Sequence, residues 1–523
     1  MALIPEFAYL QHFWYNKTIK SKERSTVKMP DLERQHYLAE IDRLTKLVDV
    51  LTSTITAQTD TIAEMSAKID ALQQTIKDLT ERVNKNSRNS SKPPSSDGYQ
   101  KPSPKSLRER SGKKQGGQKG HPGSNMVLPH EPDDVKQHYP EKCLQCAHLA
   151  ECVKDGTISA CGGSRYVVDV EVTTRVTKHE TMQASRCPFG ETGLSGQFPD
   201  DIRAYIQYGD SVTVLTGLLS TYGAVAMNRI HVLLGSLMGV KLSVGTIATM
   251  VRKCAKKVGP VMKTVQKLLQ KAHVGCFDET GVRACGKLLW VHNSSNERFT
   301  FQTISQKRGK QGIDENGVLP EFDGVAMHDC WSPYWKYEGI RHAICNAHLL
   351  RELTGIAEND PEHKWPILFK TLLRNMKKAK EKAIARGKTK LREYFLYEFG
   401  REYDRIMKIA NAECPDPSIN APRKRGRKKK GKERALIERL MLLKDAVCLF
   451  VHDFKVPFDN NQAERDLRPV KSKRAVSGCF RSEAGAQDYL DVMSYLSTGK
   501  KHGISVFDAL TAAFAGNAEI ILQ

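Results

Sequence analysis

A heptad repeat of apolar residues constrains the fold of this chain more than any other feature of its sequence. Isoleucine or valine recurs at every seventh position from Ile41 to Val83, and leucine or methionine fills a second position from Leu44 to Leu79, where only Gln58 interrupts. No glycine or proline breaks the run. β-Branched residues at one seam position with leucine at the other favour a parallel two-stranded coiled coil. We therefore predict a coiled coil over residues 31–84 that pairs copies of the chain as a homodimer or higher oligomer. A long amphipathic helix packed on its own domain is the alternative.

The chain as a whole is long and strongly basic. Its 523 residues exceed the size at which single cores stop growing, so several domains are expected. It carries 81 lysines and arginines against 59 acids, for a formal net charge of +22 at pH 7. Such a charge favours an anionic partner, most commonly nucleic acid. A merely solvated cationic surface is the alternative.

The N-terminal segment and the cysteines bear on where the protein works. Residues 1–30 form an unassigned leader in which Pro5, Glu6 and His12 interrupt any secretory core. No stretch of the sequence approaches the roughly 20 apolar residues that a membrane helix needs. We therefore expect no membrane partner and a cytoplasmic location. The 13 cysteines are then expected to be reduced, metal-bound or buried rather than bridged.

Two segments follow the heptads. Residues 85–124 are rich in Ser, Pro, Gly, Lys and Arg, which predicts a basic disordered linker that either contacts phosphates or merely connects. Residues 125–197 alternate like β-strands and contain Cys143-x-x-Cys146, whose spacing suits two corners of a tetrahedral zinc site. We predict a small zinc-binding domain with Cys187 as a third ligand and Cys152, Cys161 and His179 competing for the remaining corner. A cluster of buried free thiols is the alternative.

Helical periodicity dominates residues 198–270. Ser243 is a predicted helix start, and Gly223 and Gly239 are predicted stops. The resulting helical domain carries Arg229, Arg252, Lys253 and Lys256. It either docks DNA or supports the domain that follows, and we favour the second interpretation.

Residues 271–345 change to the period-two pattern of strands. Three antiparallel strands are expected, the first ending near Asp278, and a fourth short strand ends at Asp329. If the first and fourth strands are neighbours, these acids converge. With a third acid they can hold two divalent cations roughly 3.5 to 4 Å apart for phosphoryl transfer, and oxygen ligands suit Mg²⁺ or Mn²⁺. Solvated caps at strand ends are the alternative.

The third acid lies beyond a helical insertion. Residues 346–445 predict amphipathic helices dense in Lys and Arg, with a basic loop at 422–434 that either grips a DNA end or is a disordered connector. Residues 446–480 then contain "PFDNNQAERDLRPVKSK", in which Asp459 or Asn460 can cap a helix carrying Glu464, with Pro469 closing it. Residues 481–523 form a C-terminal helical segment.

Several motifs in a fixed order resemble the insertion-sequence-66 family of transposases. They are the heptads, "NSRNSSKPPSSD" at 86–97, "GGQKGHPG" at 116–123, the Cys-x-x-Cys segment, "DETG" at 278, "HDCW" at 328, "CNAHLLRE" at 345 and "PFDNNQAERDLRPVKSK" at 457. The resemblance implies a multidomain α+β and α/β protein with an RNase-H-like core, formed by residues 271–345 and 446–480 around the insertion. It also implies that Asp278, Asp329 and Glu464 are catalytic and bind two Mg²⁺ or Mn²⁺ ions. Two departures from the family pattern are Lys119 in place of a proline and the incomplete second cysteine pair.

The implied reaction is the cutting of element ends with metal-activated water, followed by attack of the freed 3′-hydroxyl on target DNA. Such a protein would be nucleoid-associated, with DNA and helper proteins of the same element as partners. We expect Arg465, Arg468, Lys471 and Lys473 to hold phosphates, with Arg468 on the same helix face as Glu464. His348 is expected to be a buried structural histidine. A DNA-binding regulator or inactive relic, and a metal-dependent nuclease without strand transfer, are the alternative functions.

Overall fold

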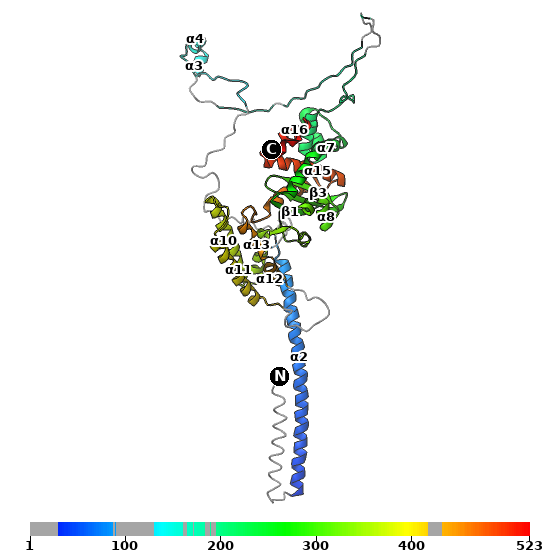
Figure 1. Ribbon diagram of the computed structural model, residues 1–523, viewed down its shortest axis with the longest axis vertical. Coiled ribbons are helices and arrows are strands. Elements are labelled where there is room, and N and C mark those ends of the chain that lie inside the picture. Colours follow the sequence, from blue (N-terminus) through cyan, green and yellow to red (C-terminus); the bar gives the residue numbers. More distant parts are fainter. Residues whose placement is uncertain are drawn as a thin grey trace. The chain divides into compact units, whose positions relative to one another are not determined.

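The computed structural model describes residues 30–86, 89, 130–159, 165–170, 172–183, 189, 195–416 and 431–523 (Figure 1). The chain forms two compact units, residues 1–85 and 86–523. The leader before Pro30, nearly all of the predicted linker and residues 417–430, which include residues 422–430 of the predicted basic loop, lie outside the described residues.

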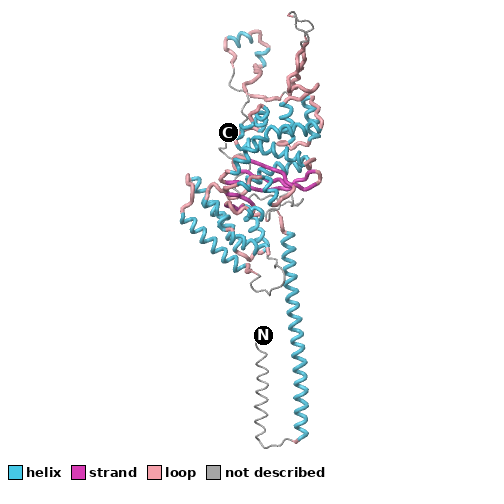
Figure 2. The backbone as a smooth tube through the Cα atoms, turned by 45° about the vertical axis from the view of Figure 1, so that its right-hand side comes forward, coloured by secondary structure: helices cyan, strands magenta, loops and turns pink. Residues whose placement is uncertain are grey.

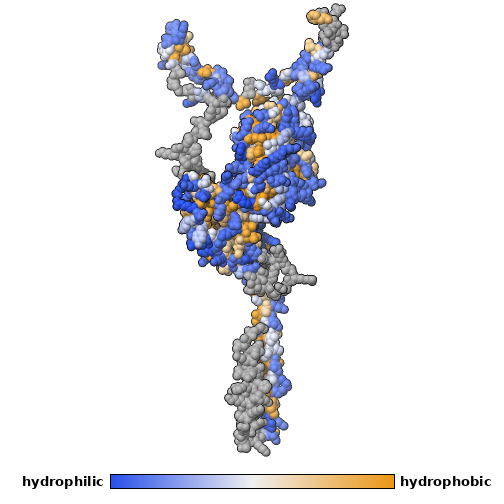
Figure 3. All heavy atoms as spheres, in the orientation of Figure 1, coloured by the Kyte–Doolittle hydropathy of each residue, from blue (hydrophilic) through white to orange (hydrophobic). Residues whose placement is uncertain are grey.

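A single helix, α2, accounts for the described part of the first unit. It runs from Asp31 to Val83 over 53 residues, with acids in its first turn and Arg82 in its last, where each complements the helix dipole. The heptad residues lie at the surface of this helix: Ile41 is 49% exposed and Ile62 is 67% exposed (Figure 3). This exposure leaves an apolar seam open along the helix, which a coiled-coil partner would cover.

The second unit is built around one five-stranded sheet. Its strands are β1 (Val274–Ala284), β2 (Lys287–Ser295), β3 (Thr300–Ser305), β4 (Val325–His328) and β5 (Arg341–Ile344). Their order is β3-β2-β1-β4-β5, with β1, β2 and β3 antiparallel and β1, β4 and β5 parallel. The predicted strands are therefore present, and the first and fourth are neighbours. The first strand does not end near Asp278 as predicted, because its pairing with β2 carries it on to Ala284; only its pairing with β4 ends before Asp278.

Helices cover both faces of the sheet (Figure 2). One face packs on α9 (Asn346–Asn359), α10 (Trp365–Ala385), α11 (Glu393–Glu413), α12 (Lys432–Leu442) and α13 (Lys444–His452). The other packs on α7 (Val244–Gln270), α15 (Glu483–Lys501) and α16 (Val506–Phe514). Side chains of the strands alternate between these two faces. Cys276 and Met327 pack in the core with α9 to α13, whereas Phe277 and Ala326 pack in the core with α7, α15 and α16. The remaining elements of this part are α5 (Asp210–Ser220), α6 (Met227–Met238), α8 (Lys310–Asn316), η2 (Leu319–Glu321), η3 (Ser332–Lys336) and η4 (Ala518–Leu522).

Helix α15 covers the open edge of the sheet at β3. The backbone N–H groups of Thr300, Gln302 and Ile304 donate to side-chain oxygens of α15, namely Thr498 Oγ1 at 3.1 Å, Ser494 Oγ at 3.1 Å and Gln487 Oε1 at 3.0 Å. An uncovered edge strand would present these donors to other chains. The C-terminal segment therefore completes the sheet.

Helix α14 (Asn461–Ser477) corrects one expectation. Proline 469 was predicted to close the helix, yet the helix continues through it for two further turns. The reason is packing: Leu467 and Val470 on either side of Pro469 are buried against β1, β2 and α15. The core thus overrides the local preference of proline.

The described residues of the segment predicted to contain strands and zinc ligands form little regular structure. It has two short helices, α3 (Glu141–Leu144) and α4 (Leu149–Lys154). The strand prediction is wrong for its described residues, where only one bridge forms, between Gln183 and Ser195. Val167 is 90% exposed and Val176 is 88% exposed, so the alternating residues have no sheet to pack on.

Candidate active site

Two of the predicted acids lie at equivalent positions on neighbouring parallel strands. The β1–β4 pairing ends at Cys276 opposite Met327. Asp278 lies two residues after Cys276, and Asp329 lies two residues after Met327. Because successive side chains of a strand alternate between its faces, both acids are on the same face of the sheet as Cys276 and Met327. Adjacent strands are about 4.8 Å apart, and the register therefore brings the two carboxylates side by side.

The turn that carries Asp329 is held by a chain of histidines. His328 Nδ1 accepts from the Cys330 N–H at 3.1 Å, so its Nε2–H donates to His342 Nδ1 at 2.9 Å. His342 in turn donates from Nε2 to the Tyr337 carbonyl at 3.0 Å. Burial, and then His342, lowers the pKa of His328 to about 3, which keeps this relay neutral. Cys330 has a positive φ of 73°, and the Trp331 N–H donates to Asp329 Oδ1 at 3.0 Å.

The third acid, Glu464, arrives on the first turn of α14. The residue before that helix, Asn460, is buried and donates from Nδ2 to the Phe277 carbonyl at 2.8 Å. The Asn460 N–H donates to Cys345 Sγ at 3.2 Å, and the Glu464 N–H donates to the Asn460 carbonyl at 3.3 Å. The cap is provided by Asp459, whose Oδ1 accepts from the Asn461 N–H at 3.2 Å. The Asn460 side chain makes no cap bond and instead tethers the start of α14 beside the residue that precedes Asp278.

The carboxylates repel one another. The pKa of Asp278 is raised well above its usual range by burial first, and then by the charges of Glu279, Asp329 and Glu464. In the part of the chain that the structure describes, neither Asp278 nor Asp329 forms an ion pair with a cationic side chain. These partly buried oxygen ligands, two of which have no cationic partner among the described residues, fit divalent cations. The three acids do not all place an oxygen within 4.8 Å of one another, a spread compatible with ligands shared between two ions.

A fourth acid, Glu279, was not predicted and faces the opposite side of β1. Its side chain is 1% exposed and bonds Arg308 at 3.0 and 2.7 Å and the Tyr334 hydroxyl at 2.7 Å. The Arg308 guanidinium also lies over the rings of Trp290 and Trp331, 4.8 and 4.2 Å from their centroids. These partners compensate Glu279 within the fold. No local pattern reveals them, because Arg308 and Tyr334 come from other segments.

His348 lies close to the acids, although it was expected to be structural. Its Nε2 is 3.9 Å from Glu464 Oε1, and its buried Nδ1 has no hydrogen-bond partner among the described residues. Burial, and then the charge of Arg351 one turn on, lowers the pKa of His348. The motif "CNAHLLRE" was the available signal, but only the fold shows that it faces Glu464.

The four cations predicted to hold phosphates divide into two groups. Arg465, Arg468 and Lys471 are exposed on α14. Lys473 is only 9% exposed, and its ammonium lies over the rings of Phe480 and Tyr489 and donates to Ser477. Burial lowers its pKa. This placement does not fit the phosphate contact that we predicted for Lys473.

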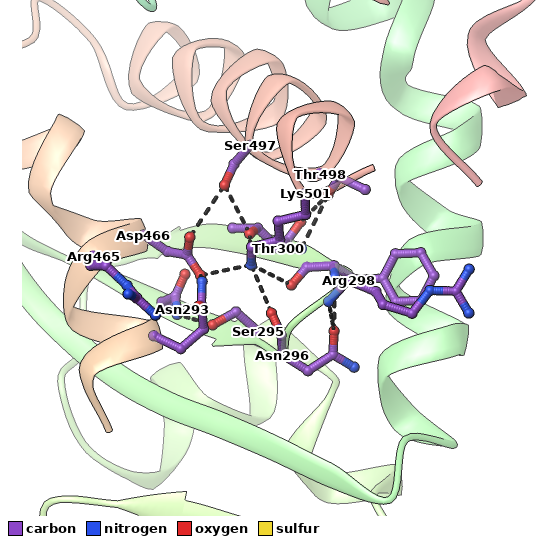
Figure 4. A network of polar contacts seen from close by, with 12 residues as sticks. Asn293, Ser295, Asn296, Arg298, Thr300, Arg465, Asp466, Ser497, Thr498 and Lys501 are labelled. Atoms are coloured by element: carbon purple, nitrogen blue, oxygen red, sulfur yellow. Dashed lines mark hydrogen bonds and ion pairs between the residues drawn. The ribbon is translucent and has the colours of Figure 1, made fainter. Parts of the chain in front are cut away.

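A buried ion pair fixes α14 behind Glu464. Asp466 and Lys501, with side chains 6% and 11% exposed, meet at 2.9 Å. Figure 4 shows Asp466 on α14 facing Lys501 and Ser497 of α15, with Thr300 of β3 beside them. The ammonium also donates to the carbonyls of Asn296 and Phe299, each at 2.9 Å. The network therefore joins α14 to α15 and to the sheet edge. Its residue on α14, Asp466, lies two residues after Glu464.

One other group in the described residues could hold a metal ion. Asp360, His363 and Glu433 each place a ligand atom within 4.8 Å of the others, in the helical insertion. Glu433 Oε1 already accepts from His363 Nδ1 and from Trp365 Nε1, both at 2.7 Å. These bonds tie α12 to the start of α10, which gives the cluster a structural role without an ion.

The predicted zinc ligands are described only in part. Cys143 and Cys146 share one turn, where the Cys146 N–H donates to the Cys143 carbonyl at 3.1 Å. Both are free thiols, as is Cys152. Cys161 and Cys187 lie outside the described residues.

The fold and site define a mixed α+β protein with an acidic centre where the pairing of two parallel strands ends. A family model described as "Transposase IS66 family" matches residues 214–488, more than half of the chain. The chain therefore belongs to the IS66 family of transposases, as its motifs predicted. A second model, described as "Family of unknown function (DUF6444)", matches residues 28–126. No curated protein matches the chain, and no helix among its described residues is both long and apolar enough to cross a membrane.

Proposed function

We propose that the chain is a DNA transposase that cuts the ends of an insertion sequence and joins them to target DNA by divalent-metal-dependent phosphoryl transfer. The register that sets Asp278 beside Asp329, with Glu464 delivered by α14, carries this proposal. The strand order, three antiparallel strands followed by two parallel ones, supports an RNase-H-like core. The raised pKa of Asp278 supports a shared acidic centre, because neighbouring carboxylates contribute to it.

Each group has a proposed task. Asp278, Asp329 and Glu464 would hold two Mg²⁺ or Mn²⁺ ions, which supply activation of the attacking oxygen and stabilisation of the leaving oxygen. Arg465, Arg468 and Lys471, exposed on the same helix as Glu464, would hold DNA phosphates. His348 would orient Glu464, from which it is 3.9 Å away.

Two further parts of the chain have proposed partners. The exposed heptad seam of α2 supports pairing with a second copy, which would bring two DNA ends into one assembly. Cys143 and Cys146, on one turn, support a Zn²⁺ site completed by Cys187 or another ligand. Helper proteins of the same element remain a proposal from the family resemblance alone.

Strand joining by purified protein tests the function. The parent protein, Glu464→Gln and the control Glu381→Gln, on an exposed helix face, are incubated with Mn²⁺ and DNA carrying the element's terminal repeats. We expect joined products from the parent and the control, and none from Glu464→Gln, which loses a ligand charge. Joining that survives Glu464→Gln would contradict the acidic triad. Binding of the repeats without any cutting by the parent would favour the DNA-binding regulator, and cutting without joining would favour the nuclease.

A further inference from the structure

Helices α5 and α6 and the first half of α7 form a three-helix unit with its own small core. Ile230, Leu234, Leu242, Ile247 and Met250 are each at most 6% exposed and pack together. The second half of α7 belongs to a different core, where it packs against the sheet and α15. One helix thus serves two structures: Ile247 and Met250 near its start complete the three-helix core, and the residues from Cys254 onward pack in the core that supports the sheet, to which Val214 of α5 also contributes.

The connection between α6 and α7 is a tight, well-fixed turn. Helix α6 ends at Gly239, whose φ of 68° is left-handed, and α7 begins after Ser243, whose hydroxyl accepts from the Thr246 N–H at 3.0 Å. Between them Leu242 is fully buried, and its carbonyl lies 2.6 Å from His231 Nδ1 on α6. Two helices joined by a short glycine-containing turn over a shared core form a helix-turn-helix.

The first turns of α7 present one polar face to solvent. Gly245, Thr249, Arg252 and Lys256 are exposed and follow the spacing of a single helix face, opposite the buried Ile247. The side chains at its start are small, and cations follow toward the C-terminus. This order suits a helix in a DNA groove, because short side chains permit close approach while longer cations reach the phosphates.

The stretch that contains α5, α6 and the whole of α7 has a one-sided charge. Residues 204–271 contain nine lysines and arginines, all exposed, against a single acid, Asp210. Lys253 pairs with Asp210 at 2.7 Å, and Arg252 approaches Asp488 at 3.6 Å. Among the described residues, Arg229, Lys241 and Lys256 form no ion pair. Exposed cations without acids attract a polyanion over a surface of this size.

We propose that α6 and α7 form a second DNA-binding site, with the first turns of α7 in the major groove of duplex DNA. Gly245 and Thr249 face the base edges, Lys241, Arg252 and Lys256 contact phosphates, and Arg229 at the start of α6 meets the backbone that this helix crosses. The inference rests on the proposed function only in taking the bound duplex to be the element end. Since α7 continues into the core that supports the sheet, the duplex is held at a fixed distance from Asp278, Asp329 and Glu464.

DNA binding without added Mg²⁺ or Mn²⁺ tests the site apart from catalysis. Full-length protein is titrated onto a labelled terminal-repeat duplex and a scrambled duplex at several salt concentrations. Lys241→Gln/Lys256→Gln should reduce the slope of log K against log[salt] by about 1.8, since each lost phosphate contact removes about 0.9. Thr249→Glu should lower affinity for the repeat by at least about tenfold and reduce its preference over the scrambled duplex, because it sets a carboxylate against the bases. Lys287→Gln, which replaces the exposed lysine at the first position of β2, should change neither the salt slope nor the preference for the repeat.

Crosslinking gives a second measurement that does not depend on other DNA contacts of the chain. p-Benzoylphenylalanine in place of Thr249 should crosslink to the duplex, and the same group in place of Lys287 should not. Equal crosslinking at both positions, or an unchanged salt slope in the double variant, would overturn the proposal. Glu464→Gln separates the two ideas: it should retain the Thr249 crosslink while losing strand joining. Joining by the parent with no crosslink at position 249 would leave the proposed function standing and refute this site.

Discussion

Substitution of Lys501 by methionine isolates the buried ion pair that holds α14 in place. Methionine keeps much of the length and volume of the lysine side chain but removes its charge and donors. It leaves the Asp466 carboxylate, 6% exposed, without its cation, and the carbonyls of Asn296 and Phe299 without a donor. Burial is the largest cause of the lowered pKa of Lys501, so the ammonium is desolvated. When it is removed, water does not replace its bonds to Asp466 and the two carbonyls.

The expected magnitude follows from that desolvation. Removing one partner of a buried, hydrogen-bonded ion pair costs about 3 to 5 kcal/mol. Local opening of α14 and the β3 edge should therefore become between about a hundredfold and a few thousandfold more frequent, at about 1.4 kcal/mol per tenfold. The double variant Asp466→Leu/Lys501→Met removes both charges and should regain at least half of the loss. Lys500→Met removes an exposed neighbouring ammonium that donates to the Tyr222 hydroxyl at 2.9 Å, and this variant should stay within about 0.5 kcal/mol of the parent.

Hydrogen exchange with mass spectrometry measures this opening directly. The amides of Thr300 and Gln302 donate to α15 side chains, so their exchange reports the β3–α15 contact, and α14 peptides report the helix that carries Glu464. A loss below about 1 kcal/mol in Lys501→Met would refute the reasoning. So would a double variant no more protected than the single one, because the unpaired charge would then not be the cause.

Three further predictions concern pH, the acidic site and assembly. Burial raises the pKa of Asp491 to about 6, above its unfolded value near 3.9, so its contribution to stability is complete below about pH 3.9 and lost as the pH rises through 6. Asp491→Asn should then stabilise the protein by about 3 kcal/mol at pH 8 and hardly at all at pH 4; urea titrations giving equal differences at both pH values would contradict this. His348→Asn should weaken Mn²⁺ binding and strand joining by about 10- to 100-fold through misplacement of Glu464, and an unchanged Mn²⁺ titration would show that His348 is only structural. Ile62→Asp in the heptad seam should convert the assembly to monomers by light scattering, whereas Ala63→Asp on the next position should not; equal masses would argue against pairing through α2.

Much of the architecture follows from local pattern. The heptads determine one long helix because nothing in them breaks it, and the period-two residues from Val274 to Ser305 determine three strands joined by short turns. Motif spacing also selected Asp278, Asp329 and Glu464 as one candidate site, and it identified the family that the chain belongs to. These features can be predicted because each depends on residues close together in the chain or on a motif that carries its own context.

Other features depend on partners distant in sequence. Proline 469 lies inside a helix because Leu467 and Val470 are buried on either side of it, and Lys473 turns inward onto Phe480 and Tyr489 although its neighbours are solvent-exposed cations. Glu279 finds Arg308 and Tyr334, and Asp466 finds Lys501, only after the sheet has formed. The sequence by itself thus determined the long helix and the strands around the acidic site, and which acids to consider. Only the tertiary structure decided which charges are buried, because burial and pairing are set by contacts that no local period encodes.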